Sequence, residues 1–130
     1  MKLVLDSNVI LAAFATRGLC AEIFESCIEK HEIVISAQII NEVSANLSKK
    51  FKMPADKITL ITDYLKEFCT LAETDIQSEK VSRDPDDDGI LNLALVSGSE
   101  LIITGDKDLL VIEEYKGIKI VSPREFIEKT

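Results

Sequence analysis

Acidic side chains occur at four separate places in the chain, and they are candidates for a functional site. Asp6 follows the apolar run Leu3-Val4-Leu5, and Asp106 comes two residues after a second apolar run that ends at Thr104. Glu42 lies between them in the sequence. A dense acidic group comes later and consists of Asp84, Asp86, Asp87 and Asp88. Because carboxylates brought together repel one another unless a cation neutralises them, a convergence of these groups predicts a divalent metal site.

The types of ligand available indicate which metal and which reaction to expect. Carboxylate oxygens favour a hard ion such as Mg²⁺ or Mn²⁺, which keeps several of its waters. Such an ion can activate water and stabilise a phosphodiester under in-line attack, and two ions about 3.5–4 Å apart can do both. The chain has one histidine and three cysteines without a Cys-x-x-Cys pair, which argues against a zinc site. The predicted chemistry is metal-assisted phosphoester hydrolysis.

Each of these acids also has an ordinary structural interpretation. Asp6 opens an Asp-Ser-Asn sequence that suits a turn or a helix cap. Glu42 lies about 60° outside the apolar arc of its helix, where most side chains are solvated. The aspartates at 86–88 can interact with a helix dipole, and Asp106 or Asp108 can cap a short helix. The prediction of a site therefore depends on the convergence of the acids at one sheet edge.

Alternating strand and helix patterns provide the framework that would bring the acids together. Continuous apolar runs are typical of buried parallel strands, so the pattern predicts the α/β class, with a parallel sheet covered by helices on both faces. In such a sheet, ligands bind beyond the carboxyl ends of the strands, where the winding reverses. The predicted strands are 2–6, 32–36, 100–104 and 118–121, with a short extended piece at 70–74. The predicted helices are 8–15, 20–30, 37–51, 54–69, 90–96 and 107–115, and residues 75–88 form the predicted long loop.

Length and composition indicate one acidic globular domain over residues 1–130. The chain contains 23 Asp and Glu against 15 Lys and Arg, a formal net charge of -8. It begins without a cleavable apolar segment, and no apolar run approaches the roughly 20 residues that span a bilayer. We therefore expect a cytoplasmic protein that does not contact a membrane.

The net charge at first argues against a nucleic-acid partner, because phosphate binding usually requires a basic excess. The position of the charge changes this interpretation. Setting aside the eight acids in or near the proposed site leaves 15 acidic residues, which equals the 15 basic ones. Those eight are Asp6, Glu42, Asp84, Asp86, Asp87, Asp88, Asp106 and Asp108.

Several motifs stand in a fixed order along the chain. They are Val4-Leu5-Asp6-Ser7-Asn8-Val9, Glu42, Arg83-Asp84-Pro85-Asp86-Asp87-Asp88 with the following Ile90-Leu91 and Ala94-Leu95, Thr104-Gly105-Asp106-Lys107-Asp108-Leu109-Leu110, and Ser122-Pro123-Arg124-Glu125-Phe126. Together they resemble the PIN-domain family, most closely its prokaryotic branch of VapC-like toxins from type II toxin–antitoxin pairs. The resemblance spans essentially the whole chain. It implies a three-layer α/β/α fold with a central parallel sheet, a Mg²⁺- or Mn²⁺-dependent endoribonuclease acting on RNA, and an antitoxin protein that covers the acidic groove.

The resemblance also implies which residues bind the metal. One central aspartate is selected by the family's Asp-x-x-Ile-x-x-x-Ala pattern, which fits Ile90 and Ala94 and chooses Asp87. These three residues share a helix face, and Asp88 is the alternative. The implied catalytic metal ligands are Asp6, Glu42, Asp87 and Asp106.

Further positions match supporting roles in the same family. Asn8 and Thr104 match supporting polar positions, while Asp84 and Asp108 are further candidate ligands. The family also leads us to expect basic residues beside the groove. Lysines near a helix end can instead be solvated and interact with the helix dipole, an equally good interpretation. The candidate RNA phosphate contacts are Arg17, Lys49, Lys50 and Lys52.

Other functions stay open at this stage. A haloacid-dehalogenase-like phosphatase would also place Asp6 after a first strand, but it needs a second Asp where this chain has Asn8. A non-catalytic acidic module would bind a basic partner and would keep that binding when metal is chelated. The apolar face formed by Ile58, Ile61 and Leu65 could serve the core or a homodimer, and the sequence does not choose.

Overall fold

The strands assemble into one sheet that is parallel except at one edge. This computed structural model describes residues 1–16, 18–73 and 85–129, and for residues 85–88 it describes the backbone alone. The strands are β1 (Lys2–Leu5), β2 (Glu32–Ile35), β3 (Thr70–Leu71), β4 (Leu101–Ile103), β5 (Glu114–Tyr115) and β6 (Ile118–Val121). In the described part, their order is β3-β2-β1-β4-β6-β5, and only the β5–β6 pair is antiparallel.

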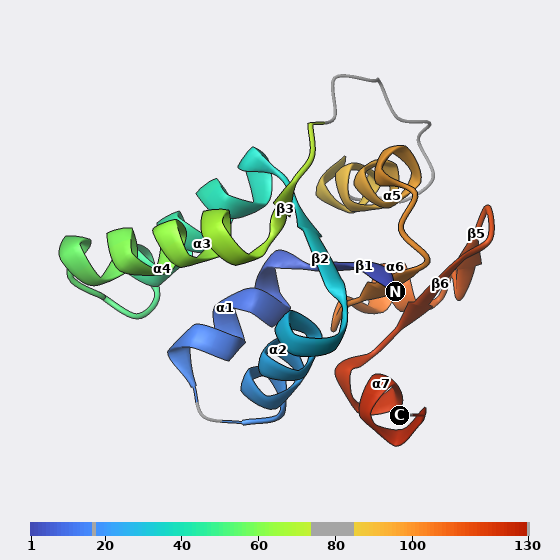
Figure 1. Ribbon diagram of the computed structural model, residues 1–130, viewed down its shortest axis with the longest axis horizontal. Coiled ribbons are helices and arrows are strands. Elements are labelled where there is room, and N and C mark those ends of the chain that lie inside the picture. The colour runs from blue at the N-terminus through green and yellow to red at the C-terminus, as the bar shows by residue number, and fades with distance from the viewer. Residues whose placement is uncertain (17, 74–84, 130) are drawn as a thin grey trace.

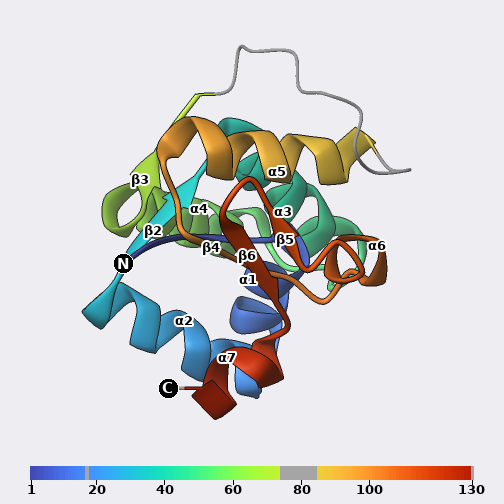
Figure 2. The same ribbon diagram turned by 90° about the vertical axis from the view of Figure 1, so that its right-hand side faces the viewer.

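Helices flank both faces of this sheet, which confirms the predicted α/β architecture. Figure 2 shows α5 above the sheet, with α1, α2 and α7 below it, while Figure 1 shows α3 and α4 side by side. The helices are α1 (Ser7–Ala15), α2 (Leu19–Lys30), α3 (Ala37–Lys49), α4 (Ala55–Phe68), α5 (Pro85–Ser97), α6 (Lys107–Leu110) and α7 (Pro123–Lys129).

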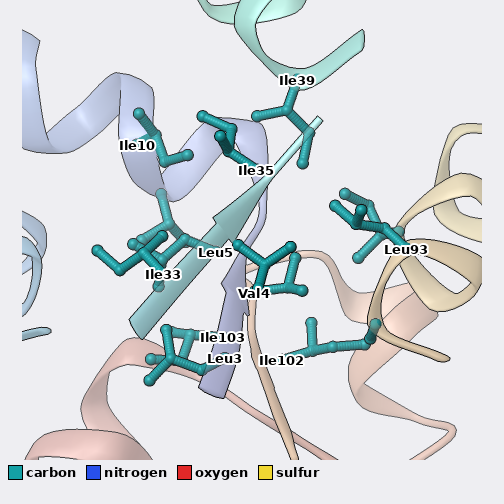
Figure 3. Close-up of a cluster of buried hydrophobic side chains, with 14 of the residues drawn as sticks. Leu3, Val4, Leu5, Ile10, Ile33, Ile35, Ile39, Leu93, Ile102 and Ile103 are labelled. Atoms are coloured by element: carbon teal, nitrogen blue, oxygen red, sulfur yellow. The ribbon is translucent and has the colours of Figure 1, made fainter. Parts of the chain in front are cut away.

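Successive side chains of β1 point into two different layers of the core, because strand residues alternate between the faces of a sheet. Figure 3 shows Leu5 of β1 and Ile33 of β2 on the side of Ile10 from α1. Val4 lies on the opposite side, toward Leu93 of α5. All five side chains are almost completely buried. The apolar strands therefore hold helices on both faces and fix the central position of β1.

The carboxyl end of β1 is the point where the winding of the sheet reverses. β1 pairs in parallel with β2 on one side and with β4 on the other. Leu5 is in register with Ile103, and the N–H of Asp6 donates to the carbonyl of Ile103 at 3.0 Å. Asp6 and Thr104 therefore follow directly from neighbouring strands, at the sheet edge where α/β proteins place their ligands.

The prediction of one helix over 107–115 was wrong. Helix α6 ends at Leu110, and Glu113 then adopts a left-handed backbone with φ 64°. The chain continues into β5, which turns back through Lys116 and Gly117, at φ 48° and 86°, and pairs antiparallel with β6. A two-residue hairpin with both φ values positive matches the twist of the flanking strands, and its second residue here is a glycine. The sheet is therefore mostly, but not entirely, parallel.

Other predicted boundaries also need correction. Helix α5 begins at Pro85, so residues 85–88 do not belong to the loop predicted at 75–88, and proline suits a first helical position. The rest of that predicted loop, 75–84, lies outside the described residues. The predicted strand 2–6 ends at Leu5, since Asp6 instead caps α1. Helix α7 was not predicted, although Ser122 and Glu125 form a capping box through reciprocal hydrogen bonds of 3.1 and 3.3 Å.

The apolar side of α4 mainly serves the core. Leu65 is completely buried, and Ile58 and Ile61 pack partly buried against the core cluster. Phe68 is 50% exposed and packs against Tyr64, with ring centroids 4.6 Å apart.

Among the described residues, no single helix is long and apolar enough to cross a membrane. Only the pair α1 and α2, bent by 106° at their junction, together have the length and composition of a span.

Candidate active site

Asp6 is a buried carboxylate held at the end of β1. Its side chain is 7% exposed, and its Oδ1 accepts a hydrogen bond of 2.7 Å from the N–H of Ser7, which caps α1. Its Oδ2 accepts a second bond of 2.7 Å from the hydroxyl of Thr104. Burial raises the pKa of Asp6, the two hydrogen bonds oppose this rise, and the charges of Asp106 and Glu42 add to it. Asp6 therefore lies within electrostatic reach of two other acids.

The hydroxyl of Thr104 connects the two acids of the sheet edge. Thr104 is completely buried and donates to Asp6, while its Oγ1 accepts a hydrogen bond of 3.0 Å from the N–H of Asp106. Asp106 is partly buried, and its Oδ1 accepts from the N–H of Asp108 at 2.8 Å, which caps α6. The structural interpretation of Asp6 and Asp106 as helix caps is thus correct for both. Capping also fixes where each carboxylate lies.

Glu42, a residue of α3, lies near Asp6. This helix begins after Ser36, whose Oγ accepts a hydrogen bond of 3.2 Å from the N–H of Ile39. Glu42 is partly buried, and its Oε1 accepts a hydrogen bond of 3.3 Å from Nε2 of Gln38. Glu42 is one of the charges that raise the pKa of Asp6. The strand-to-helix turn after β2 therefore brings a third carboxylate toward Asp6.

The central aspartates belong to the beginning of α5. Asp86, Asp87 and Asp88 lie within its first turns, which Figure 2 shows at the same end of the sheet as α6 and the end of β1. Their side chains, and all of Asp84, lie outside the described residues. Gly89, the next residue of α5, lies close to Gln38 of α3, because a Cβ built on Gly89 would lie 3.5 Å from Oε1 of Gln38. The start of α5 therefore approaches the segment of α3 that carries Glu42.

The donor set fits a hard divalent cation. In the described contacts, Asp6 receives hydrogen bonds from neutral donors, and the nearby charges that affect its pKa are both negative. A cation would relieve this repulsion, and carboxylate and hydroxyl oxygens are the ligands that Mg²⁺ and Mn²⁺ prefer. Within the described side chains, no three His, Cys, Asp or Glu residues form a group ready to hold a metal ion. Asp6, Glu42 and Asp106 are all among these described side chains, so the three acids do not form such a group by themselves.

Comparison with known proteins identifies the family. A model of the PIN domain matches residues 2–108. The chain belongs to the PIN-domain family. Among solved structures, it resembles VapBC2 from Rickettsia felis, described bound to a promoter DNA fragment, with a TM-score of 0.66 and 12% identity over 94% of this chain and 98% of the other. It also resembles the PIN domain endonuclease Utp24, with a TM-score of 0.56 and 21% identity over 93% and 84% of the chains. No curated protein sequence matches.

Several predicted positions of this PIN domain have no described hydrogen bond to Asp6, Glu42 or Asp106. Asn8 is exposed in the first turn of α1. Lys49, Lys50 and Lys52 are exposed at and just beyond the end of α3, where Lys52 has a left-handed backbone with φ 51°. Arg17 lies outside the described residues. The roles of these five positions stay predictions.

The sequence analysis missed two residues that donate hydrogen bonds to the acids. Ser7 supplies the backbone N–H that binds Asp6, and Gln38 binds Glu42. The signal for Gln38 was its spacing from Glu42, since residues four apart on a helix face each other. The signal for Ser7 was the predicted turn at Asp6, because a helix that starts there presents unpaired N–H groups.

Proposed function

We propose that this PIN domain, taken as one domain over residues 1–130, is a divalent-metal-dependent endoribonuclease. Family membership and the fold shared with a PIN domain endonuclease support a nuclease. The observation that carries the proposal of a metal-dependent ribonuclease is the pair of hydrogen bonds that joins Asp6 through Thr104 to Asp106. Glu42 also lies close enough to raise the pKa of Asp6. The proposed metal ligands are Asp6, Glu42, Asp106 and, from α5, Asp87 or Asp88, with Asp84 and Asp108 as further candidates.

The chain's own residues prepare the site before a metal or a substrate arrives. Thr104 and the N–H of Ser7 hold both oxygens of Asp6, and capping of α6 holds Asp106. A bound Mg²⁺ or Mn²⁺ would neutralise the carboxylates, activate a water and stabilise charge on the phosphodiester. Because the backbone and Thr104 fix Asp6 and Asp106, these two carboxylates need little reorganisation for the reaction.

The proposal includes an RNA groove, with Lys49, Lys50, Lys52 and Arg17 contacting phosphates. It also includes a role as the toxin of a toxin–antitoxin pair in the cytoplasm, with a cognate antitoxin as protein partner. The fold shared with a VapBC2 chain supports this role. A test in growing bacteria would compare the unsubstituted chain with Asp6→Asn: the first should stop growth, and the second should not.

Cleavage of labelled nucleic acid tests the enzymatic proposal. Single-stranded RNA and DNA of one sequence would be incubated with the protein and Mg²⁺, Mn²⁺ or EDTA. We expect RNA cleavage with metal and none with EDTA. Asp6→Asn should reduce cleavage by about a thousandfold, whereas Asp63→Asn, at an exposed acid of α4, should leave it unchanged. Cleavage that keeps the unsubstituted rate in EDTA or in Asp6→Asn would contradict the proposal.

The same preparation separates the other two candidate functions. Hydrolysis of p-nitrophenyl phosphate without RNA cleavage would favour a phosphatase. A basic peptide that binds equally well in EDTA, again without cleavage, would favour the acidic interaction module. Neither alternative accounts for the match of residues 2–108 to the PIN domain.

A further inference from the structure

Gln38, a residue of α3, hydrogen-bonds to Glu42 and lies close to the start of α5. It lies one turn before Glu42 on α3, and its Nε2 donates a hydrogen bond of 3.3 Å to Oε1 of Glu42. The same amide lies against α5, because a Cβ built on Gly89 would be 3.5 Å from Oε1 and 3.9 Å from Nε2 of Gln38. One side chain therefore links the Glu42 carboxylate to the first turns of α5.

The residue opposite the Gln38 amide is a glycine, although it lies inside a helix. Glycine there costs about 0.5–1 kcal/mol relative to alanine. Gly89 does not adopt the positive φ that would require a glycine, unlike Gly98 and Gly117. A Cβ at residue 89 would reach ordinary contact distance from the amide, so any longer side chain would compete with Gln38 for space. The small residue thus leaves room for Gln38 between the two helices.

We propose that Gln38 is a positioning residue that fixes the Glu42 carboxylate and its spacing from the start of α5. This inference rests on the proposed function, in which both helices contribute metal ligands. In the described part of the chain, no other hydrogen bond reaches the side chain of Glu42. A hydrogen bond to an ionised acceptor is stronger than one between neutral groups. Partners of this kind, one step removed from the metal, typically change metal affinity by about 10–100-fold.

Direct binding of Mn²⁺ to the full chain tests the proposal without using catalysis. Electron paramagnetic resonance measures free Mn²⁺ during a titration of the unsubstituted protein and of Gln38→Met, which keeps side-chain length but removes the donor. We expect about tenfold weaker Mn²⁺ binding in Gln38→Met, with the unfolding temperature of the metal-free protein unchanged. Asn41→Ala removes an exposed amide from the same helix and should bind Mn²⁺ like the unsubstituted chain.

Substitutions at Gly89 test the placement of Gln38 from the α5 side. Gly89→Ala should preserve Mn²⁺ affinity, because its Cβ fits at 3.5 Å from the amide oxygen. Gly89→Leu should weaken binding about as much as Gln38→Met, since the longer side chain displaces Gln38. A merely structural role predicts lower unfolding temperatures for the damaging variants with unchanged Mn²⁺ affinity.

The possible results separate this inference from the proposed function. Equal Mn²⁺ affinity in Gln38→Met and the unsubstituted chain would overturn the role of Gln38. Weaker Mn²⁺ binding in Gln38→Met, together with RNA left intact by the unsubstituted protein, would support Gln38 and overturn the nuclease proposal. An unsubstituted chain that binds no Mn²⁺ would overturn both.

Discussion

At the carboxyl ends of β1 and β4, Asp6 and Asp106 are joined through the buried hydroxyl of Thr104, whereas Glu42 on α3 is bound by one exposed amide, that of Gln38. The first region, which we call the strand-end region, is fixed by the sheet register and by two helix caps. The second, which we call the helix region, comprises Glu42, Gln38 and the first turns of α5. The two regions carry acids for one proposed site, but they differ in how firmly the fold holds those acids.

This difference predicts where folding stability and metal binding are coupled. In the strand-end region a substitution changes buried hydrogen bonds, so it should affect both folding and metal affinity. In the helix region the polar contacts are exposed or partly exposed, so a substitution should affect metal affinity with little change in folding. Substitutions in the two regions therefore make the comparison testable.

Asp6→Asn should have the largest effect on cleavage, a loss of about a thousandfold, because a metal ion contributes several kcal/mol to transition-state stabilisation and each 1.36 kcal/mol is a factor of ten. The metal-free protein should nevertheless become more stable. Burial raises the pKa of Asp6 above its ordinary 3.8, so at neutral pH ionisation opposes folding, and a neutral Asn removes that cost. Asn retains the capping of α1 through its amide oxygen, and its Nδ2 donates to the Thr104 hydroxyl in place of the carboxylate oxygen that accepted from it.

Single-turnover cleavage of labelled RNA and thermal unfolding in EDTA check these two expectations. Asp63→Asn on α4 is the matched control and should change neither rate nor stability, since its carboxylate is exposed. A lower unfolding temperature for metal-free Asp6→Asn would contradict the view that a desolvated, repelled carboxylate destabilises this fold.

Glu42→Gln should reduce cleavage by about a hundredfold, a smaller loss than Asp6→Asn, because the helix region holds its ligand less firmly. Its free energy of unfolding without metal should stay within about 0.5 kcal/mol of the unsubstituted value. The unfolding temperature should respond less to added Mn²⁺ than that of the unsubstituted chain. A large loss of stability in EDTA would show that the helix region is as strongly coupled to folding as the strand ends.

Thr104→Val should weaken Mn²⁺ binding by about 10–100-fold while keeping the shape of the side chain. It should also destabilise the metal-free fold by about 1–3 kcal/mol, because a buried carboxylate oxygen and the N–H of Asp106 lose their partner. Thr104→Ser, which keeps the hydroxyl, should restore Mn²⁺ affinity. If Val and Ser bind Mn²⁺ equally well, the hydroxyl does not position the acids.

The contrast between the regions also explains what the sequence could predict. Asp6 and Thr104 follow continuous apolar strands, so their meeting at one sheet edge depends only on strand order and parallel register. By contrast, the sequence pattern did not select Gln38, whose role depends on the approach of α5 to α3. That approach joins residues about 50 positions apart, and no local pattern in a single sequence records it.

The errors in the fold have similar causes. The helix predicted over 107–115 continues past Leu110, where α6 ends. Backbone conformations at Glu113 and Lys116, not hydrophobic pattern, turn the chain into β5. Helix α7 had a local signal, the capping box from Ser122 to Glu125, and could have been predicted.

The smallest expected effect lies outside the helix region as defined above, where Lys49 and Lys50 are exposed at the C-terminal end of α3. If both bind RNA phosphates, the double substitution to alanine should reduce the slope of log K against log salt by about 0.7 per lysine for a single strand. Binding would be measured in the Asp6→Asn background, so that RNA stays intact. Lys66→Ala on α4 removes an exposed charge elsewhere and should leave the slope unchanged. An equal change per lysine in the two variants would mean that α3 contributes only its acid, and that net charge alone governs the affinity for RNA.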